Sequence, residues 1–168
     1  GVMVELEKEI IKKVCDLISY PETSGGTFPT GGSMSNFMAL IIARDKKYPN
    51  IKHAGQTSKL ICYSSEESHY SISKNASFAG IGRDNVRYIP TNVEGQMIPE
   101  ALEDVIKKDL QDGLDPLFVN ATVGTTVLGA IDPITKIGEI CKKYNIWFHI
   151  DGAYSGTVIF SKKYQNLI

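Results

Sequence analysis

The sequence predicts a three-layer α/β/α fold built around a mainly parallel β-sheet. Short apolar runs alternate along the chain with helical patterns of about ten residues, an order typical of α/β domains. The 168 residues are 42% hydrophobic and 22% charged, an ordinary composition for a globular protein with a buried core. The chain contains no internal repeat and no low-complexity segment, so no repeat architecture is expected.

Residues 1–22 are predicted to form a helix that leads into the domain. Apolar residues fall on one helical stripe with charged residues elsewhere, and Pro21 ends the pattern. The stripe consists of Leu6, Ile10, Val14, Leu17 and Ile18. The rest of the chain, 23–168, is predicted to be part of one α/β domain, whose last residues, 161–168, add no closing element.

Helices and strands are predicted to alternate through residues 23–168. Pro99 and Pro133 stand near the first turn of two of the helices, and Asp132 is predicted to cap the second of these. Polar residues predict an exposed loop at 48–58. The predicted helices cover 34–45, 70–78, 99–110 and 133–144, and the predicted strands cover 59–63, 86–89, 117–122 and 146–150.

The charge pattern argues against nucleic-acid and membrane partners. There are 18 Lys and Arg and 19 Asp and Glu residues, which give a net charge of −1, so no basic surface is expected. No apolar stretch approaches the ~20 residues of a membrane span. Cys15, Cys62 and Cys141 are odd in number, far apart and without a C-x-x-C pair. They predict a reduced, cytoplasmic protein without a metal site.

In a parallel α/β sheet, ligands bind where strands end and helices begin, and four such places carry unusual residues. The first is T-G-G-S-M-S-N at 30–36. Its glycines let a ligand approach the backbone, while Ser33, Ser35 and the free N–H groups of a helix start offer donors to an anion. The segment predicts a phosphate site, although a capped helix after a flexible turn explains it equally well.

The second place is S-S-E-E-S-H-Y at 64–70. His69 is expected at a helix N-terminus, whose positive end disfavours the charged imidazolium. A neutral ring there can lie flat against an aromatic ligand. The alternative is a helix capped by Ser68 with His69 merely nearby. No function is expected of His53, in a polar loop, or of His149, at a sheet–helix interface.

The third and fourth places follow the predicted strands 117–122 and 146–150. After the first strand, the sequence N-A-T-V-G-T-T puts threonine hydroxyls beside a glycine, and after the second, D-G-A-Y begins with Asp151. A carboxylate directly after an apolar strand needs a cation or several hydrogen bonds if it is buried. Simple turns remain the alternative for both segments.

Together, four segments in this order resemble the group II pyridoxal-phosphate decarboxylases of the fold type I superfamily. Among the members of this group, the chain is similar to glutamate decarboxylase and cysteine sulfinate decarboxylase, and aromatic amino-acid decarboxylases are more distant. The resemblance runs from about Gly25 to the C-terminus. The segments are TGGSMSN, SSEESHYSISK, NATVGTTVLGAIDP and WFHIDGAYSG.

The resemblance implies a role for individual residues. Gly32 and Ser33 match the positions that hold the cofactor phosphate, and His69 matches the histidine stacked on the pyridine ring. Phosphate binding at a helix N-terminus is physically consistent, because the N–H groups and the helix dipole both favour an anion. Neutral His69 would fix the plane of the ring without adding charge.

The second half of the matched site surrounds the ring itself. Asp151 matches the aspartate bonded to the pyridine nitrogen, Ala153 the small residue on the other face of the ring, and Thr126 the threonine near the ring substituents and the substrate carboxylate. An aspartate there keeps the nitrogen protonated, so that the ring acts as an electron sink. The resemblance implies pyridoxal 5′-phosphate as cofactor and His69, Asp151 and Thr126 as catalytic residues.

The chain departs from the family pattern at two points. Family members usually read Asp-Ala-Ala where this chain has Asp-Gly-Ala at 151–153, a change that keeps the carboxylate. The family's Schiff-base lysine follows a histidine some tens of residues further on, so it is expected outside these residues, together with the small domain. Lys162 and Lys163 come too early and lack that histidine, and they are predicted to be surface charges.

The resemblance implies decarboxylation of a small, acidic L-amino acid such as glutamate, aspartate or cysteine sulfinate by a homodimeric parent enzyme. Two alternatives stay open. The chain could be a non-catalytic fragment or pseudoenzyme with an assembly role, through its amphipathic opening helix. It could also keep the cofactor and catalyse carbon–carbon lysis or amino transfer instead, which the motif GTTVLGAIDP disfavours.

Overall fold

The computed structural model describes residues 1–56 and 58–167 and has the predicted α/β/α architecture. Residue 57, in the predicted loop 48–58, lies outside the described residues. The helices are α1 (Val2–Leu17), α2 (Gly32–Lys47), α3 (Ile51–Ala54), α4 (Ser71–Phe78), α5 (Pro99–Gln111) and α6 (Ile134–Tyr144). The strands are β1 (Leu60–Ser65), β2 (Val86–Ile89), β3 (Asp115–Thr122) and β4 (Trp147–Asp151), and 3₁₀ turns cover Arg83–Asn85, Gly156–Phe160 and Gln165–Leu167.

The four strands form one parallel sheet in the order β2-β1-β3-β4. Ser64 of β1 pairs with Asn120 of β3, and Thr122 of β3 pairs with Asp151 of β4. The carboxyl ends of the strands therefore meet at one edge of the sheet. Each strand continues there into a loop that carries one of the polar segments, except β2.

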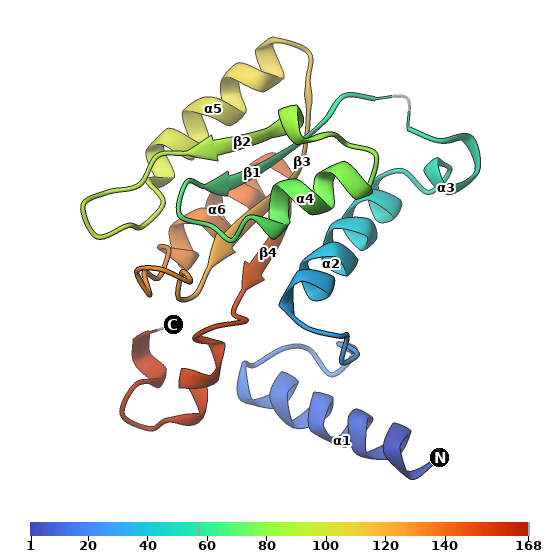
Figure 1. Cartoon of the computed structure of the whole chain (residues 1–168), viewed down its shortest axis with the longest axis vertical. Coiled ribbons are helices and arrows are strands. Elements are labelled where there is room, and N and C mark those ends of the chain that lie inside the picture. Colours follow the sequence, from blue (N-terminus) through green and yellow to red (C-terminus); the bar gives the residue numbers. More distant parts are fainter. Residues whose placement is uncertain (57, 168) are drawn as a thin grey trace.

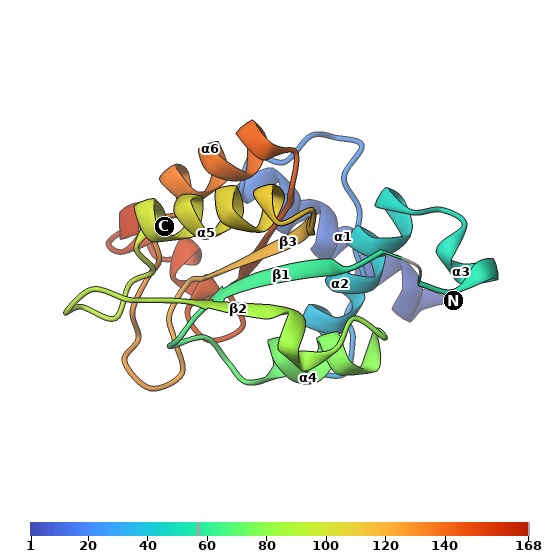
Figure 2. The same ribbon diagram turned by 90° about the horizontal axis from the view of Figure 1, so that it is seen from above.

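Helices cover both faces of the sheet, which makes three layers (Figure 2). On one face, α2 and α4 pack against β1 and β3 through residues such as Leu40, Ile72 and Phe118. On the other face, α5 and α6 pack through Ile106, Ile137 and their neighbours. Because β1 is covered on both sides, all six of its residues are buried, which explains why its first four residues, 60–63, are apolar without alternation.

Helix α1 lies apart from the sheet, below α2 in Figure 1. It ends at Leu17, before Pro21 as predicted, and none of its residues is buried. One carboxylate oxygen of Glu7 accepts hydrogen bonds from the Thr27 hydroxyl and the Phe28 N–H, both at 2.8 Å. This contact ties α1 to the segment that leads into α2.

Most predicted elements match within one or two residues, and the differences have local causes. Strand β1 runs on to Ser65, beyond the predicted end at residue 63, because Ser64 and Ser65 still pair with β2. Helix α3 lies within the predicted loop 48–58. Within the described residues, no helix is both long enough and apolar enough to cross a membrane.

The predicted capping role of Asp132 is wrong. Helix α6 begins at Ile134, Pro133 is its N-cap, and no side chain caps it. The buried Asp132 carboxylate instead accepts hydrogen bonds from the N–H groups of Met97 and Thr122, both at 2.7 Å. Burial raises the pKa of this carboxyl, although both hydrogen bonds oppose the shift. Asp132 thus joins the end of β3 to the segment ahead of α5.

Candidate active site

The first turn of α2 presents free donors at the edge of the sheet. Gly31 has a φ of 102°, a backbone conformation that favours glycine. Its carbonyl accepts the N–H groups of Met34 and Ser35, and within the described residues the N–H groups of Gly32 and Ser33 have no acceptor. The Ser35 hydroxyl bonds back to Gly31 O at 3.3 Å. Ser33 lines the pocket described below, whereas Ser35 does not.

Gly32 and Ala153 approach each other closely although 121 positions separate them in the chain. A Cβ atom on Gly32 would lie 2.9 Å from the Cβ of Ala153, closer than real Cβ contacts allow. A larger side chain at residue 32 would fill the space between α2 and the loop after β4. Glycine at residue 32 keeps this space, called the cradle below, open.

His69 lies at the start of α4, as the sequence predicts. Its Nδ1 accepts a hydrogen bond from the Ser71 N–H at 3.2 Å, so the imidazole itself serves a free N–H group of the helix start. The alternative of a cap by Ser68 is wrong, because the Ser68 hydroxyl contacts the Ser65 hydroxyl at 3.0 Å instead. Since Nδ1 is an acceptor, the ring is held in one orientation.

Asp151 is the last residue of β4 and is only 7% exposed. Its Oδ1 accepts the Ala153 N–H at 3.0 Å, and its Oδ2 accepts the Asn36 amide at 2.8 Å. The ion pairs of the described residues do not include it. A buried carboxylate without a cation is costly, so this site suits a ligand that brings a positive charge.

Thr126 lies in the exposed loop after β3, next to the buried Thr125. The Thr125 Oγ1 accepts the Ala130 N–H at 3.1 Å and closes the loop on itself. Gly124, with a φ of 84°, packs so tightly on Ser155 that a Cβ there would overlap the serine side chain. The loop is thus held against the segment after β4, with Thr126 among its exposed residues.

All six predicted site residues line one pocket with a volume of about 250 Å³. Four segments contribute to it: the first turns of α2, the residues just before α4, and the ends of β3 and β4 with the loops that follow them. The predicted residues are Gly32, Ser33, His69, Thr126, Asp151 and Ala153, and Asn36, Thr122, Gly124 and Tyr154 complete the lining. Lys162 and Lys163 are exposed and do not line it.

The sequence reasoning missed two polar side chains that support Asp151. Asn36 of α2 is 3% exposed and contacts Asp151, Ser71 and His149. His149, for which no function was expected, does lie at the sheet–helix interface, stacked on Phe118 with ring centroids 5.3 Å apart. Burial lowers its pKa, against the opposing charge of Asp151. Asn36 closes the quoted motif TGGSMSN, which was the available signal.

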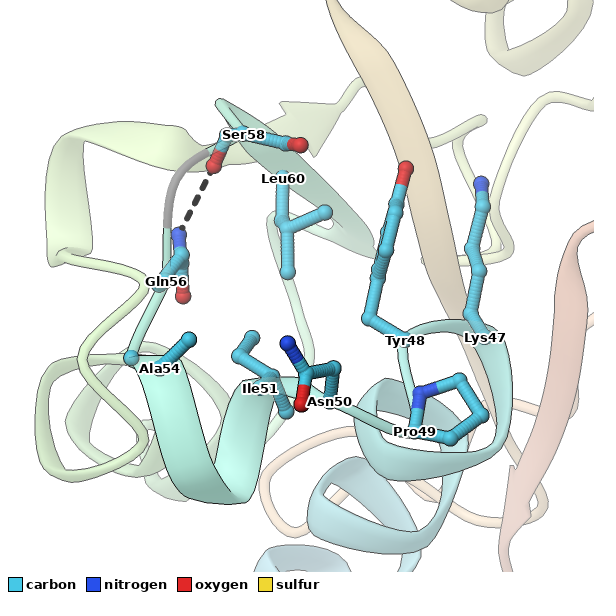
Figure 3. Close-up of a pocket in the computed structure, with 10 residues that line it drawn as sticks. Lys47, Tyr48, Pro49, Asn50, Ile51, Ala54, Gln56, Ser58 and Leu60 are labelled. Carbon is cyan, nitrogen blue, oxygen red and sulfur yellow. Dashed lines mark hydrogen bonds between the residues drawn. The ribbon is translucent and has the colours of Figure 1, made fainter.

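A second pocket, of about 270 Å³, lies at the opposite edge of the sheet, beside the start of β1 at Leu60 (Figure 3). The Lys47 ammonium contacts an oxygen of Asp115 at 2.5 Å, and the Tyr48 hydroxyl bonds the other oxygen. The amide of Gln56 donates to Ser58 O at 3.1 Å. Among the described residues, the Gln56 carboxamide oxygen is buried without a hydrogen-bond partner. The amino ends of parallel strands, however, are not where ligands of such sheets bind.

The residues present fit pyridoxal phosphate. The α2 start supplies N–H donors for a phosphate, Gly32 leaves the cradle open, and the uncompensated carboxylate of Asp151 suits a protonated pyridine nitrogen. Half-buried His69 stands on another wall of the same pocket.

Comparisons with known proteins agree with this fit. The pyridoxal-dependent decarboxylase conserved domain matches residues 1–168. The acidic amino acid decarboxylase GADL1 of Xenopus tropicalis is 43% identical over 166 residues, which cover 98% of this chain and 32% of that protein. This chain therefore spans about a third of the length of that relative.

Solved structures have the same fold. Mouse CSAD matches with a TM-score of 0.96 and 41% identity over 99% of this chain and 36% of that one. Oryza sativa TDC, solved with PLP, matches with a TM-score of 0.80 and 26% identity over 96% of this chain and 37% of that one. The predicted fold class, enzyme class and cofactor class are confirmed at the level of the family: the chain belongs to the pyridoxal-dependent decarboxylases.

Proposed function

We propose that the protein carrying this chain binds pyridoxal 5′-phosphate in the pocket between α2, α4, β3 and β4 and decarboxylates a small, acidic L-amino acid. One observation carries the proposal: six residues from four separate segments line a single pocket around a buried carboxylate that forms no ion pair among the residues the structure describes. The relative named as an acidic amino acid decarboxylase supports the substrate class.

Each residue has a distinct task in this proposal. The N–H groups of Gly32 and Ser33 and the Ser33 hydroxyl bind the phosphate at the helix start. His69 stacks on one face of the ring, and Ala153 packs against the other. Asp151 holds the proton on the ring nitrogen. Bound in this way, the cofactor supplies an electron sink for the electron pair released when carbon dioxide leaves.

Thr126 has the remaining task. Thr126 is exposed in the loop after β3 and lines the pocket, so its hydroxyl is available to the substrate carboxylate and to the ring substituents. Because Gly124 and Ser155 hold this loop in place, Thr126 orients the carboxylate that is lost. Its hydroxyl is a weak, neutral donor, which binds a carboxylate without stabilising it so strongly that its loss becomes slow.

The lysine that holds the cofactor covalently is proposed to lie in the full-length protein outside this chain. Residues 23–168 would then be part of the cofactor-binding large domain, with 1–22 as the helix that leads into it. We also propose a homodimer in the cytoplasm. The apolar side chains of α1, none of which is buried in the chain itself, support a contact with a second copy, and the free cysteines Cys15, Cys62 and Cys141 support a reducing compartment.

The test is release of labelled carbon dioxide by the full-length protein with pyridoxal phosphate. Carboxyl-labelled glutamate, aspartate and cysteine sulfinate are the test substrates, and phenylalanine and tryptophan are the controls. The proposal expects release from at least one acidic amino acid and little from the aromatic ones. It also expects borohydride reduction to leave the cofactor attached to the protein. Cofactor binding without release from any amino acid would favour an assembly role or another reaction.

A further inference from the structure

Asn36 connects the two polar side chains of β4 that lie beneath α2. Its Nδ2 is 2.8 Å from Asp151 Oδ2 and 3.1 Å from the Ser71 hydroxyl, and its Oδ1 is 2.8 Å from His149 Nε2. All hydrogen-bonding atoms of the amide are thus engaged except one lone pair. The side chain is 3% exposed, so its position in the structure is tightly defined.

The orientation of this amide follows from its partners. Asp151 is an acceptor when ionised, so only an N–H can face its oxygen at 2.8 Å. The amide oxygen must then face His149, whose Nε2 has to carry a hydrogen. The His149 ring stacks on Phe118 and cannot turn freely. His149 therefore fixes Asn36, and Asn36 fixes Asp151.

The Asn36 donor has a consequence for any proton that Asp151 shares. A hydrogen bond donated to a carboxylate makes it a weaker acceptor for a further proton. Asp151 has a second donor in the Ala153 N–H at 3.0 Å, but that bond goes to the other oxygen. A ligand nitrogen that shares a proton with Asp151 therefore faces a carboxylate whose Oδ2 already accepts a hydrogen bond from Asn36. This carboxylate attracts the shared proton less strongly.

We propose that Asn36 is a positioning residue of the cofactor site, which aims the Asp151 carboxylate and keeps the shared proton on the ring nitrogen of bound pyridoxal phosphate. The inference rests on the proposed function and adds a residue outside the six predicted ones. His149 acts one step further away, by orienting the Asn36 amide.

The test measures the ring nitrogen directly. The full-length protein is loaded with pyridoxal phosphate labelled with nitrogen-15 in the ring, and the nitrogen resonance is compared between the unmodified protein and Asn36→Leu. The variant removes the hydrogen-bond donor to Asp151. The population with the proton on the ring nitrogen, relative to the population with the proton on Asp151, should therefore fall by about tenfold to a hundredfold, the range for one hydrogen bond to a charged group. The resonance should move toward the value of unprotonated pyridine.

A matched control separates positioning from packing. Asn75 is buried between the same two helices, and its amide donates to Ser33 O at 2.9 Å without touching Asp151. Asn75→Leu should lower the melting temperature as Asn36→Leu does, but leave the nitrogen resonance in place. His149→Phe keeps an aromatic ring on Phe118 and loses the Nε2 hydrogen. It should move the resonance in the same direction by less, and it serves as the second variant if Asn36→Leu does not fold.

The outcomes separate the two proposals. An unmoved resonance in cofactor-loaded Asn36→Leu or His149→Phe would overturn the role of Asn36 and leave the proposed function standing. An equal shift in Asn75→Leu would also overturn it, since loosening of the helix pair would then explain the effect. Failure of the unmodified protein to take up the cofactor would overturn the proposed function and, with it, this inference.

Discussion

The Cβ of Ala153 occupies the space that a side chain on Gly32 would need: a Cβ built on Gly32 would lie 2.9 Å away from it. Residues at the start of α2 and just after β4 are thus matched in size across the pocket. The match explains why glycine stands at the helix start, and the proposed cofactor site between Gly32 and Ala153 can be tested by substitution.

Gly32→Ala is expected to weaken pyridoxal phosphate binding by about tenfold or more, because overpacking of this kind costs roughly 1–3 kcal/mol. Titration of the full-length protein by cofactor absorbance measures the change. Ala153→Gly removes the opposing methyl group, so the double variant should recover part of the affinity. Unchanged affinity in Gly32→Ala would contradict the close contact.

Asp132→Asn is expected to lower the free energy of unfolding by about 1–3 kcal/mol. The amide can accept one of the two N–H groups now bound by the carboxylate, and its own NH₂ group then faces the other. Urea denaturation of the full-length protein measures this loss. Asp104, whose side chain is 77% exposed, provides the control: Asp104→Asn should change stability by less than about 0.5 kcal/mol. Equal effects would mean that Asp132 does not join the two segments.

The pH dependence of stability should carry a contribution from His149. Burial lowers the pKa of this imidazole from 6.5 in the folded protein. As pH falls below 6.5, the unfolded chain takes up a proton that the folded protein still excludes, so the free energy of unfolding decreases, by at most about 1.4 kcal/mol per pH unit. The loss stops where the folded histidine protonates as well.

Denaturation curves measured from about pH 7.5 to about pH 5, the range in which histidine changes its charge, check this dependence of stability on pH. In His149→Gln the decrease should become smaller. His53 is exposed, so His53→Gln should keep the full decrease. If both variants behave alike, another group is responsible.

The isolated chain is expected to self-associate. Strand β4 pairs only with β3 among the described strands, so its other edge has free N–H and C=O groups, and α1 exposes Val2, Met3 and Leu6. Sedimentation velocity of the 168-residue polypeptide should show species larger than the monomer. A monomer that melts cooperatively would contradict this prediction.

Periodicity and turn residues were sufficient for most of the fold. The buried strand at 117–122 and the helix behind Pro99 depend on local signals, and both are present in the structure. The role of Asp132 could not be predicted, because Asp-Pro before a helix is an ordinary capping signal. Its partners, Met97 and Thr122, are brought to it only by the folded sheet.

The same limit applies to the site. Motif resemblance indicated six of the ten lining residues, each within a segment of a few positions, and the structure brings them to one pocket. Asn36 and His149 lie 113 positions apart, and nothing local in the sequence couples them. Their contact depends on how α2 crosses β4, which is a tertiary property. The hydrogen-bond partners of the buried Asp151 carboxylate are therefore the part that sequence reasoning missed.

A crystal structure of the full-length protein with pyridoxal phosphate tests the central claim most directly. The account predicts the phosphate at the N–H groups of Gly32 and Ser33, His69 against one face of the ring, and the ring nitrogen within hydrogen-bond distance, roughly 2.7–3.0 Å, of an Asp151 oxygen. A cofactor bound elsewhere, or a ring whose nitrogen points away from Asp151, would contradict it.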